Sequence, residues 1–490
     1  MSSSTNTPKI VELIDQPLLE VLNEMDASVD TFSVYNPATN EVLARVKDQG
    51  VPEVELFIDQ AHFAFSNWKK RSVDERSLLL KSWANLIREQ VDDLSLIMTL
   101  EQGKPLAESK GEILYSAGFL DWYAVEAQNA TGRIMPAHRP EQRLLVSYQA
   151  LGVGAIITPW NFPALMILRA AAPALAAGCT VVVKPADLTP LTALAIADLA
   201  IKSGIPTDVF RIITCSKEKT PSIGALLTAS PKIHKISFTG STPVGKLLAQ
   251  AGTPTLTRMS LELGGNAPFI IFEDADLDAA LEGLIASKFR NAGQACVAAN
   301  RIFIQERIYA RFIPRLIHKI EALIVGDGVE AATVIGPLIS EAAIEKAERL
   351  VEDALAKGGT LLVGGKRHLK GTHFFEPTLI ANNTEEIEAY SCEIFAPIAM
   401  VYTFKTEAEV LAKANDTIYG LAAYFYSQDR ARCWRMSEGL DAGIVCENTV
   451  AFSSARTPFG GFKQSGIGRD GGVEGLREWQ EVKYRCIGGL

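Results

Sequence analysis

The sequence predicts an α/β protein whose central part is a parallel β-sheet. From residue 152 onward, short apolar strands alternate with amphipathic helices, the pattern of parallel strands joined by crossover helices. The 490 residues are enough for two or three domains, and 48% hydrophobic with 21% charged residues is typical of a globular protein. We therefore expect a Rossmann-like parallel-sheet domain, a second α/β domain and a small β arm.

The first 150 residues precede this alternation and predict mainly helices. Residues 1–30 begin rich in Ser and Thr and predict a loosely attached leader. Apolar residues at helical spacing predict one helix from Pro52, a second over about residues 74–100 and a third over about 106–127. Residues 133–150 lose this spacing and interleave with polar residues, so they predict the strands of an arm or edge ribbon.

Five strands are expected in the central part, over residues 154–158, 180–183, 210–214, 235–238 and 267–272. Helices lie between them, including one over about 163–177. Another begins at Pro190, with Thr189 as its N-cap residue and Gly204 past its end. An open parallel sheet of this kind binds ligands at the carboxyl ends of its strands, and a nucleotide is the expected ligand.

These elements divide the chain into domains. We expect residues 1–132 and 151–262 to form the nucleotide-binding domain and residues 263–445 to form the second α/β domain. The segments 133–150 and 446–490 are expected to form the arm and a C-terminal segment that contacts another copy of the chain.

Charge and cysteine content exclude several classes of function. A net charge of -9 argues against a general nucleic-acid surface and against binding to anionic membranes. The seven cysteines are scattered and form no Cys-x-x-Cys pair, which disfavours a disulfide scaffold or zinc site. The six histidines show no metal-ligand spacing, so we expect no metal. Without a transmembrane-length apolar run or a targeting pattern, the expected location is cytoplasmic.

One cysteine stands out, between an apolar helix-like run that ends at Gly293 and a strand that begins at Arg301. A cysteine just after such a glycine can be held on a loop that faces a cavity. Cys296 could then act as a nucleophile, because a thiolate attacks carbonyl carbon. The alternative is that Cys296 is a small buried hydrophobic residue, as free cysteines often are.

The segment 240–245, Gly-Ser-Thr-Pro-Val-Gly, is a glycine-bounded turn between a strand and a helix. Backbone N–H groups at a helix start attract phosphate, and a glycine lets the phosphate come close. The segment is not the G-x-G-x-x-G fingerprint, so an ordinary turn is the alternative. Lys184 ends another strand, where ligands of open α/β sheets lie, and is either a ligand contact or a surface lysine.

Two polar residues are candidates for proton transfer and charge stabilisation. Glu262 lies between two leucines and precedes a Gly-Gly pair, where desolvation would raise the pKa of its carboxyl group toward the range of a general base. Asn161 follows Pro159 and Trp160 and could donate its side-chain N–H to an oxyanion. The alternatives are a salt-bridged loop carboxylate for Glu262 and a turn residue for Asn161.

The order of these motifs along the chain is more specific than any one of them. From about residue 33 to the C-terminus, the chain resembles the aldehyde dehydrogenase superfamily. The resemblance implies that family's fold, with a cofactor-binding domain, a catalytic domain and an oligomerisation arm. It is carried by Pro159-Trp160-Asn161-Phe162-Pro163, Lys184-Pro185-Ala186, Phe238-Thr239-Gly240-Ser241, Leu261-Glu262-Leu263-Gly264-Gly265, Gly293-Gln294-Ala295-Cys296, Glu393-Ile394-Phe395 and Pro458-Phe459-Gly460-Gly461.

The resemblance implies a role for each matching position. Cys296 would be the nucleophile and Glu262 the general base, while Asn161 and the Cys296 backbone N–H would form the oxyanion hole. Glu393 would hold the nicotinamide ribose, although Ala396 replaces the glycine of the family's Glu-x-Phe-Gly-Pro pattern. The implied cofactor contacts are Trp160, Lys184, Gly240, Ser241, Leu263, Glu393 and Phe395.

The implied reaction is the NAD(P)-dependent oxidation of an aldehyde. The Cys296 thiolate adds to the aldehyde as a thiohemiacetal, loss of hydride to the nicotinamide gives a thioester, and Glu262 activates the water that releases the carboxylate. Asp187 lies three residues after Lys184, where the resemblance places the adenosine ribose. A carboxylate there accepts a bond from a 2′-hydroxyl and repels a 2′-phosphate. We therefore expect NAD to be preferred, with NADP as the alternative.

Three longer segments, 260–278, 287–293 and 421–426, are similar to the succinate-semialdehyde dehydrogenase branch. In that branch two arginines and a serine hold the distal carboxylate of the substrate, as bidentate arginines can. A structural ion pair is the alternative for each arginine. Glutarate and 2-oxoglutarate semialdehydes carry the same carboxylate, so the sequence does not separate them from succinate semialdehyde. The positions that match the carboxylate-binding residues are Arg169, Arg290 and Ser453.

A different class of function is also compatible with these residues. A thiol acyl hydrolase or acyltransferase would use Cys296 and Glu262 without redox chemistry, although the Gly240 loop and Glu393 argue against it. The expected partners are a small carboxylated aldehyde and further copies of this chain. The 133–150 ribbon and the C-terminal strand suit a homodimer or a homotetramer.

Overall fold

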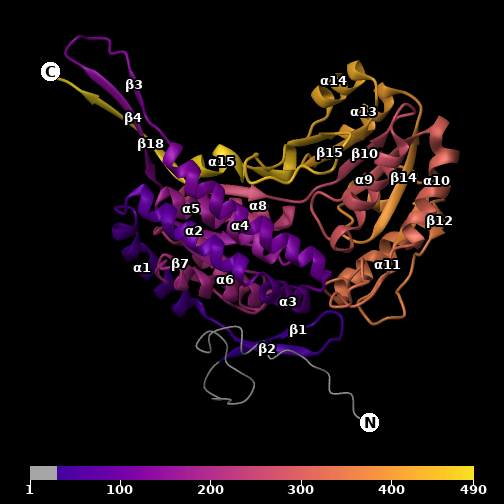
Figure 1. Cartoon of the computed structure of the whole chain (residues 1–490), viewed down its shortest axis with the longest axis horizontal. Coiled ribbons are helices and arrows are strands. Elements are labelled where there is room, and N and C mark those ends of the chain that lie inside the picture. The colour runs from indigo at the N-terminus through magenta and orange to yellow at the C-terminus, as the bar shows by residue number, and fades with distance from the viewer. Residues whose placement is uncertain (1–29, 490) are drawn as a thin grey trace.

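The computed structural model describes residues 30–489, which form two α/β bodies and a narrow β arm (Figure 1). The expected leader over residues 1–30 lies, apart from Asp30, outside the described residues. The first body contains a six-stranded sheet and the second a seven-stranded sheet. The predicted fold class, two α/β domains built on parallel strands and a small β arm, is confirmed.

The N-terminal part of the first body differs from prediction at one helix. A single helix was expected over residues 74–100, but the chain leaves helical geometry at Gln90 (φ −100°, ψ 20°), so this prediction is wrong. Asp92 and Asp93 in the first turn of the next helix stabilise its N-terminus through the helix dipole. The elements are β1 (Thr31–Tyr35), β2 (Val42–Lys47), α1 (Val51–Trp68), α2 (Val73–Glu89), α3 (Val91–Gln102) and α4 (Leu106–Asn129).

The first sheet has the strand order β17-β9-β8-β5-β6-β7, in which only β17 is antiparallel to its neighbour. Helices connect successive parallel strands, as the alternating pattern predicted. The strands are β5 (Val153–Ile157), β6 (Thr180–Lys184), β7 (Phe210–Ile212), β8 (Ile233–Thr239), β9 (Arg258–Glu262) and β17 (Gly466–Ile467). The helices are α5 (Pro163–Ala177), α6 (Pro190–Lys202), α7 (Thr220–Ala229) and α8 (Thr242–Ala251).

The fifth parallel strand of this sheet is β9. The expected fifth strand, over residues 267–272, is instead β10 of the second sheet, so its placement was wrong. Only residues 263–266 join β9 to β10. A crossover between neighbouring parallel strands needs about a dozen residues or more, so this short link takes the chain into the other body.

The start of α6 is also stabilised differently from the prediction. The helix begins at Pro190, but the Thr189 side chain makes no cap bond, and its hydroxyl has no partner among residues 30–489. The Glu101 carboxylate at the end of α3 accepts the N–H groups of Leu191 and Thr192 at 2.7 and 2.8 Å. A buried carboxylate from another helix therefore takes the role expected of Thr189.

The second sheet has the order β12-β13-β14-β11-β10-β15-β16, with only β12 antiparallel. Its inner strands are buried, because helices cover both faces of a parallel sheet. The strands are β10 (Ala267–Ile271), β11 (Ala299–Gln305), β12 (Thr360–Val363), β13 (Thr378–Ala381), β14 (Ile398–Phe404), β15 (Ala422–Tyr426) and β16 (Ile444–Glu447). The helices are α9 (Leu277–Phe289), α10 (Glu306–Glu321), α11 (Glu341–Ala356), α12 (Glu388–Ser391), α13 (Glu407–Asn415) and α14 (Arg430–Gly439).

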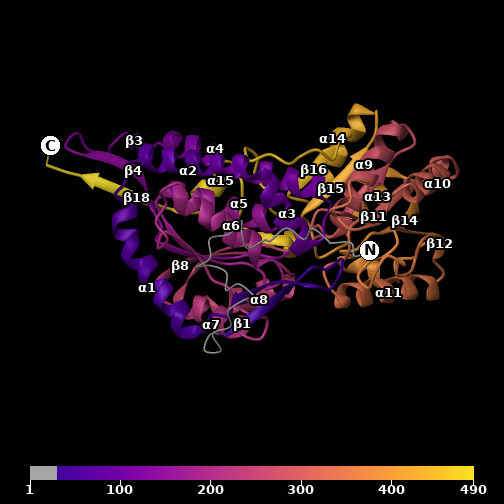
Figure 2. The same ribbon diagram turned by 60° about the horizontal axis from the view of Figure 1, so that its bottom comes forward.

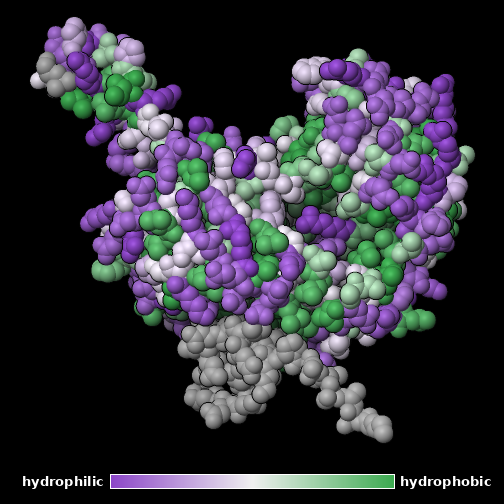
Figure 3. Space-filling view, viewed as in Figure 1, coloured by the Kyte–Doolittle hydropathy of each residue, from purple (hydrophilic) through white to green (hydrophobic). Residues whose placement is uncertain are grey.

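The arm is a three-stranded antiparallel sheet of β3 (Arg133–Met135), β4 (Arg143–Ala150) and β18 (Gln480–Ile487), reached through the short helix α15 (Gly472–Arg477). It extends away from the first body (Figure 2) and carries exposed apolar side chains (Figure 3), among them Ile134 and Val482, 79% and 63% exposed. No helix between residues 30 and 489 is long and apolar enough to cross a membrane.

Candidate active site

One cavity of about 1070 Å³ lies where the ends of the first-sheet strands meet loops of the second body. The segments that line it are far apart in the chain, and they lie at or after the carboxyl ends of strands, after short helices or near the starts of α5 and α11. Nine of the predicted site residues line this cavity: Trp160, Asn161, Gly240, Ser241, Glu262, Leu263, Cys296, Glu393 and Phe395.

Cys296 reaches the cavity from a tight turn after α9. Asn291, Ala292 and Gly293 are consecutive residues with left-handed φ angles of 51°, 52° and 73°. Two of the three are not glycine, so the turn carries backbone strain. The Cys296 side chain is partly exposed, and burial of the site raises the pKa of its thiol to about 12. A thiol in this state needs a nearby base before it can attack.

Glu262 ends β9 and can supply that base. Its side chain is 3% exposed, and neither carboxylate oxygen has a hydrogen-bond partner among the described residues. Burial raises the pKa of this carboxyl group well above its ordinary value. The Gly240 N–H donates to the Glu262 backbone carbonyl at 3.0 Å, which ties the two cavity-lining loops together. An unpartnered carboxyl group with a raised pKa is suited to proton transfer.

Asn161 follows β5 and presents a side-chain amide to the same cavity. Its Nδ2 donates to the Gln294 carbonyl oxygen at 3.0 Å, which uses one of its two N–H bonds. Its Oδ1 has no partner within residues 30–489. The second N–H is therefore available to an oxygen of a molecule bound beside Cys296.

Glu393 follows α12 and lines the same cavity. Its carboxylate accepts the Gly265 N–H at 3.1 Å, and burial raises the pKa of this group to about 7. Lys346 donates to the Glu393 backbone carbonyl at 2.7 Å and so holds the segment. The next aromatic residue, Phe395, takes the left-handed conformation (φ 56°) and packs edge-on against Trp160 with ring centroids 5.5 Å apart.

Ala396, which stands where the family's Glu-x-Phe-Gly-Pro pattern has glycine, fits the backbone of the segment that carries Glu393 and Phe395. Ala396 is 1% exposed and is not among the described non-glycine residues with positive φ, so a side chain there causes no backbone strain. Its carbonyl oxygen lies against Gly293, where a β-carbon would stand 2.2 Å away. The required glycine is therefore Gly293 in the turn before Cys296.

The residues along the cavity fit a nicotinamide dinucleotide. A β-carbon on Gly240 would stand 2.4 Å from the Phe238 ring, and one on Gly245 would stand 2.5 Å from the Leu263 side chain. A side chain at either position would displace Phe238 or Leu263, whereas glycine leaves the backbone at the start of α8 open. No side chain caps this helix at Ser241, and its N-terminal N–H groups suit a diphosphate.

Two predicted cofactor residues lie outside this cavity. Lys184, at the end of β6, is 4% exposed, and its Nζ donates to the Pro185 carbonyl at 3.1 Å. Asp187 lines a second cavity of about 710 Å³, together with Glu218. Leu188 lines both cavities, so Asp187 is adjacent to the first one.

The three predicted carboxylate-binding residues are not brought into one cavity. Arg169 is 3% exposed and forms a buried ion pair with Asp470 at 3.0 Å, the alternative that the sequence left open. Arg290 is exposed, and its guanidinium lies 5.1 Å from the centroid of the Phe162 ring. Ser453 lines a separate cavity of about 930 Å³. Of the two arginines, Arg169 is paired with Asp470, whereas Arg290 forms no ion pair with a carboxylate among residues 30–489.

Sequence reasoning missed a buried ion pair beside Asn161. Lys104 and Glu112 are completely buried, and Lys104 donates to the Asn161 backbone carbonyl at 2.7 Å. The sequence held a signal, because Glu112 falls on the inward face of the expected helix over 106–127, next to Ile113. A charged residue on an apolar helix face indicates a buried partner.

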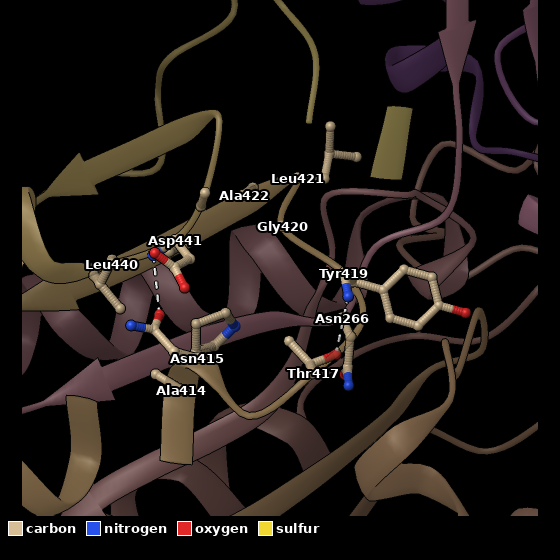
Figure 4. A pocket seen from close by; sticks show the side chains of 13 residues that line it. Asn266, Ala414, Asn415, Thr417, Tyr419, Gly420, Leu421, Ala422, Leu440 and Asp441 are labelled. Carbon is tan, nitrogen blue, oxygen red and sulfur yellow. Dashed lines mark hydrogen bonds between the residues drawn. The ribbon is translucent and has the colours of Figure 1, made fainter. Parts of the chain in front are cut away.

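A smaller cavity of about 240 Å³ lies behind the link between β9 and β10 (Figure 4). It is lined by Asn266, by residues between 414 and 423 at the end of α13 and just after it, and by residues 440–442; the Tyr419 N–H donates to Thr417 Oγ1 at 3.3 Å. None of the predicted site residues lines it. We therefore assign this cavity no part in the chemistry of the first one.

Comparison with known proteins identifies the family. The model of the aldehyde dehydrogenase family matches residues 24–484. The chain belongs to the aldehyde dehydrogenase family. The predicted superfamily, the enzyme class and the use of a nicotinamide dinucleotide by this family are thereby confirmed.

Individual relatives cover nearly the whole of this aldehyde dehydrogenase. The succinate-semialdehyde dehydrogenase [NADP(+)] of Escherichia coli is 48% identical over 94% of this chain and 95% of its own length. The 3-sulfolactaldehyde dehydrogenase of Pseudomonas putida is 47% identical over 98% of this chain and 100% of its own. The crystal structure of succinate-semialdehyde dehydrogenase from Burkholderia pseudomallei superposes with a TM-score of 0.93 at 46% identity, covering 97% of this chain and 99% of that one.

Proposed function

We propose that the chain oxidises a small aldehyde with a distal anionic group, and first of all succinate semialdehyde to succinate, with NAD(P). The single observation that carries this proposal is that Cys296, Glu262, Asn161 and Glu393 line one cavity of about 1070 Å³. That cavity places a nucleophile, an unpartnered carboxyl group and an amide donor beside the loop expected to hold the cofactor.

Each of these residues has a defined task. The Glu262 carboxylate takes the proton of the Cys296 thiol, and the sulfur adds to the aldehyde carbon to give a thiohemiacetal. The free N–H of Asn161 and the backbone N–H of Cys296 stabilise the oxyanion. A nicotinamide dinucleotide supplies the hydride acceptor. After oxidation the carbon is held as a thioester on Cys296. Glu262 releases its first proton to solvent, and the carboxylate then removes a proton from the water that attacks the thioester, so that the acid leaves and the Cys296 thiolate is regenerated.

We propose that Gly240, Ser241 and Glu393 hold the cofactor, with Trp160, Leu263, Phe395 and Lys184 around it. NAD is the proposed preference, because the Asp187 carboxylate repels a 2′-phosphate and Glu218 lines the same cavity. The NADP-dependent relative in E. coli makes NADP the alternative. On this assignment residues 1–132 and 151–262 act as the cofactor domain and residues 263–445 as the catalytic domain.

The anionic tail of the substrate is assigned to Arg290, with Arg169 and Ser453 as further candidates. The exposed guanidinium of Arg290 has no carboxylate partner among the described ion pairs, so it is available for bidentate binding. Glutarate and 2-oxoglutarate semialdehydes present the same carboxylate. A sulfonate is a further candidate tail, because a relative of nearly equal identity is named for 3-sulfolactaldehyde.

The test is a kinetic panel. Succinate, glutarate and 2-oxoglutarate semialdehydes, 3-sulfolactaldehyde and butanal are each assayed with NAD and with NADP, using wild-type protein and Cys296→Ala. We expect the highest kcat/KM for succinate semialdehyde with NAD, and no NADH from the variant. Absence of NADH from wild-type protein with every aldehyde, together with hydrolysis of activated esters, would instead support the non-redox acyl hydrolase.

We also propose a cytoplasmic homodimer or homotetramer assembled through the arm. The edge strand β18 is unpaired on one side in the described chain and carries exposed Val482 and Tyr484, 63% and 56% exposed. Edges of this kind pair with another copy unless they are protected. Multi-angle light scattering of wild-type protein and of a variant with Val482→Lys distinguishes assembled from monomeric protein.

A further inference from the structure

The backbone of Asn161 is fixed by a buried charged network. Its carbonyl oxygen accepts two hydrogen bonds, from Lys104 Nζ at 2.7 Å and from Asn291 Nδ2 at 2.9 Å. Its side chain is held separately through Gln294. Three independent contacts on one residue leave little freedom for the amide that faces the cavity.

Lys104 is held in turn by Glu112 on the neighbouring helix. The two charged groups are 2.5 Å apart with side chains that are completely buried, and Lys104 lies 4.0 Å from the centroid of the Phe162 ring. A buried charge is tolerated only when it is paired and hydrogen-bonded, so each member depends on the other.

The second oxygen of Glu112 reaches the start of α5. It accepts the N–H groups of Ala164 and Leu165 at 3.0 and 3.1 Å, the bonds that an N-cap side chain makes, whereas Phe162 at the N-cap position offers no side-chain cap. Helices α4 and α5 lie side by side, which allows this contact (Figures 1 and 2). The positive end of the α5 dipole thus stabilises the carboxylate.

We infer that Lys104 and Glu112 are positioning residues for Asn161, and that they set the direction of its amide toward the oxyanion formed at Cys296. Charges and partial charges of opposite sign alternate along this network. The positive α5 N-terminus is followed by the negative Glu112 carboxylate, the positive Lys104 ammonium and the partly negative Asn161 carbonyl oxygen. The inference rests on the proposed function, because the oxyanion exists only if Cys296 attacks an aldehyde.

The test removes the charges while keeping the helix cap. In Lys104→Met/Glu112→Gln, no unpaired charge remains, and the amide oxygen that replaces the Glu112 carboxylate still accepts the α5 N–H groups. We expect kcat to fall about 10-fold to 100-fold, the range for a misplaced catalytic group, while the Kd of NAD changes less than about twofold. A wild-type kcat in this variant would overturn the inference.

A double-mutant cycle with Asn161→Ala separates positioning from a general structural effect. Asn161→Ala alone is expected to lower kcat by about 100-fold to 1000-fold, the loss seen for one oxyanion donor. Because the pair acts through Asn161, adding Lys104→Met/Glu112→Gln should lower kcat no further. If the two losses multiply, the pair acts elsewhere and the inference is wrong.

The matched control is the pair Arg432 and Asp274 in the second body. Asp274 also accepts backbone N–H groups, those of Gln428 and Asp429 just before α14, and pairs with Arg432 at 2.6 Å. Arg432→Met/Asp274→Asn should lower the thermal midpoint without a change in kcat. If the double variant at Lys104 and Glu112 does not fold, Lys104→Met alone leaves the Glu112 carboxylate bonded to the α5 N–H groups and should show a fall in kcat of about threefold to tenfold, with the same coupling to Asn161.

The same assays separate the inference from the proposed function. If wild-type protein oxidises no aldehyde, the proposed function fails and the inference fails with it. If wild-type protein is active and the Lys104 and Glu112 variants keep its full kcat, only the inference fails.

Discussion

The backbone carbonyl oxygen of Cys296 lies where Gly265 has no side chain: a β-carbon on Gly265 would stand 2.2 Å from it. This contact brings the link between β9 and β10 against the loop that carries Cys296. Glu262 precedes Gly265 by three residues, and the Gly265 N–H donates to Glu393 at 3.1 Å. The close approach of the Gly265 and Cys296 backbones therefore helps to set the distances between Cys296, Glu262 and Glu393.

Gly265→Ala should displace the Cys296 loop. A methyl group cannot occupy a point 2.2 Å from a backbone oxygen, so the loop must move, and we expect kcat to fall by about 100-fold or more. The control is Gly224→Ala in α7, where no atom lies within 4 Å of the added carbon. That variant should keep full activity and gain about 0.5–1 kcal/mol of stability. Normal turnover by Gly265→Ala would refute the argument from close approach.

The reactivity of Cys296 should rise steeply with pH in the cofactor-free protein. Burial raises the pKa of its thiol to about 12, so the thiolate fraction increases about tenfold per pH unit below that value. Alkylation by iodoacetamide, followed by intact-mass spectrometry, should therefore accelerate about tenfold per unit from pH 7 to pH 10. The exposed Cys486 serves as an internal reference. A plateau for Cys296 below pH 9 would contradict this prediction.

Glu262→Gln should stop the reaction at the thioester. The amide cannot accept the proton of the attacking water, so stopped-flow absorbance should show a burst of about one NADH per active site followed by slow turnover. Stability should not fall, because the replaced carboxyl group is buried without a hydrogen-bond partner in the described chain. We expect a thermal midpoint equal to or above that of wild type. Steady turnover at the wild-type rate would remove Glu262 from the mechanism.

Arg290→Gln should discriminate between anionic and neutral substrates. Loss of a charge-assisted bond of about 1.5–3 kcal/mol lowers kcat/KM for succinate semialdehyde by about 10-fold to 100-fold. The value for butanal, which has no anionic tail, should change less than about twofold. The comparison uses the same enzyme preparation for both aldehydes, so a fold defect would lower both values. An equal loss for both aldehydes would assign Arg290 a structural role.

Asp187→Ser should shift the choice of cofactor. The serine removes the charge that repels a 2′-phosphate and keeps a hydroxyl for the ribose, so we expect KM for NADP to fall about tenfold or more. KM for NAD should rise only a few-fold, since a hydrogen bond to the ribose is weakened. The measurement is the ratio of kcat/KM for the two cofactors at fixed ionic strength. An unchanged ratio would place the 2′-position away from Asp187.

The local sequence predicted the elements whose signals are local. Helix α5 has the predicted bounds because Pro163 suits a first turn and Gly178 takes the left-handed conformation (φ 94°) that ends it. The order of the motifs predicted which side chains face the cavity. The carboxyl ends of parallel strands lie at the same edge of a sheet, which is why Asn161, Gly240 and Glu262, each at or after such an end, line the same cavity.

Tertiary contacts decided the rest. The sequence does not show that Glu101 replaces Thr189 as a helix cap, because Glu101 and Leu191 are 90 residues apart. Nor does it show that the ion pair of Lys104 and Glu112 lies beneath Asn161, because Lys104 and Asn161 are 57 residues apart. It left open whether Arg169 binds substrate or forms a structural ion pair, and only the fold shows that this guanidinium has a buried carboxylate partner.

By itself, the amino-acid sequence of this protein determined the fold class and the family and predicted the reacting groups, since these depend on periodicity and on residue type. The tertiary structure decided which charges are paired, which strands share a sheet and which candidates share a cavity. Those outcomes depend on desolvation and on distance between segments far apart in the chain, and no local pattern encodes either one.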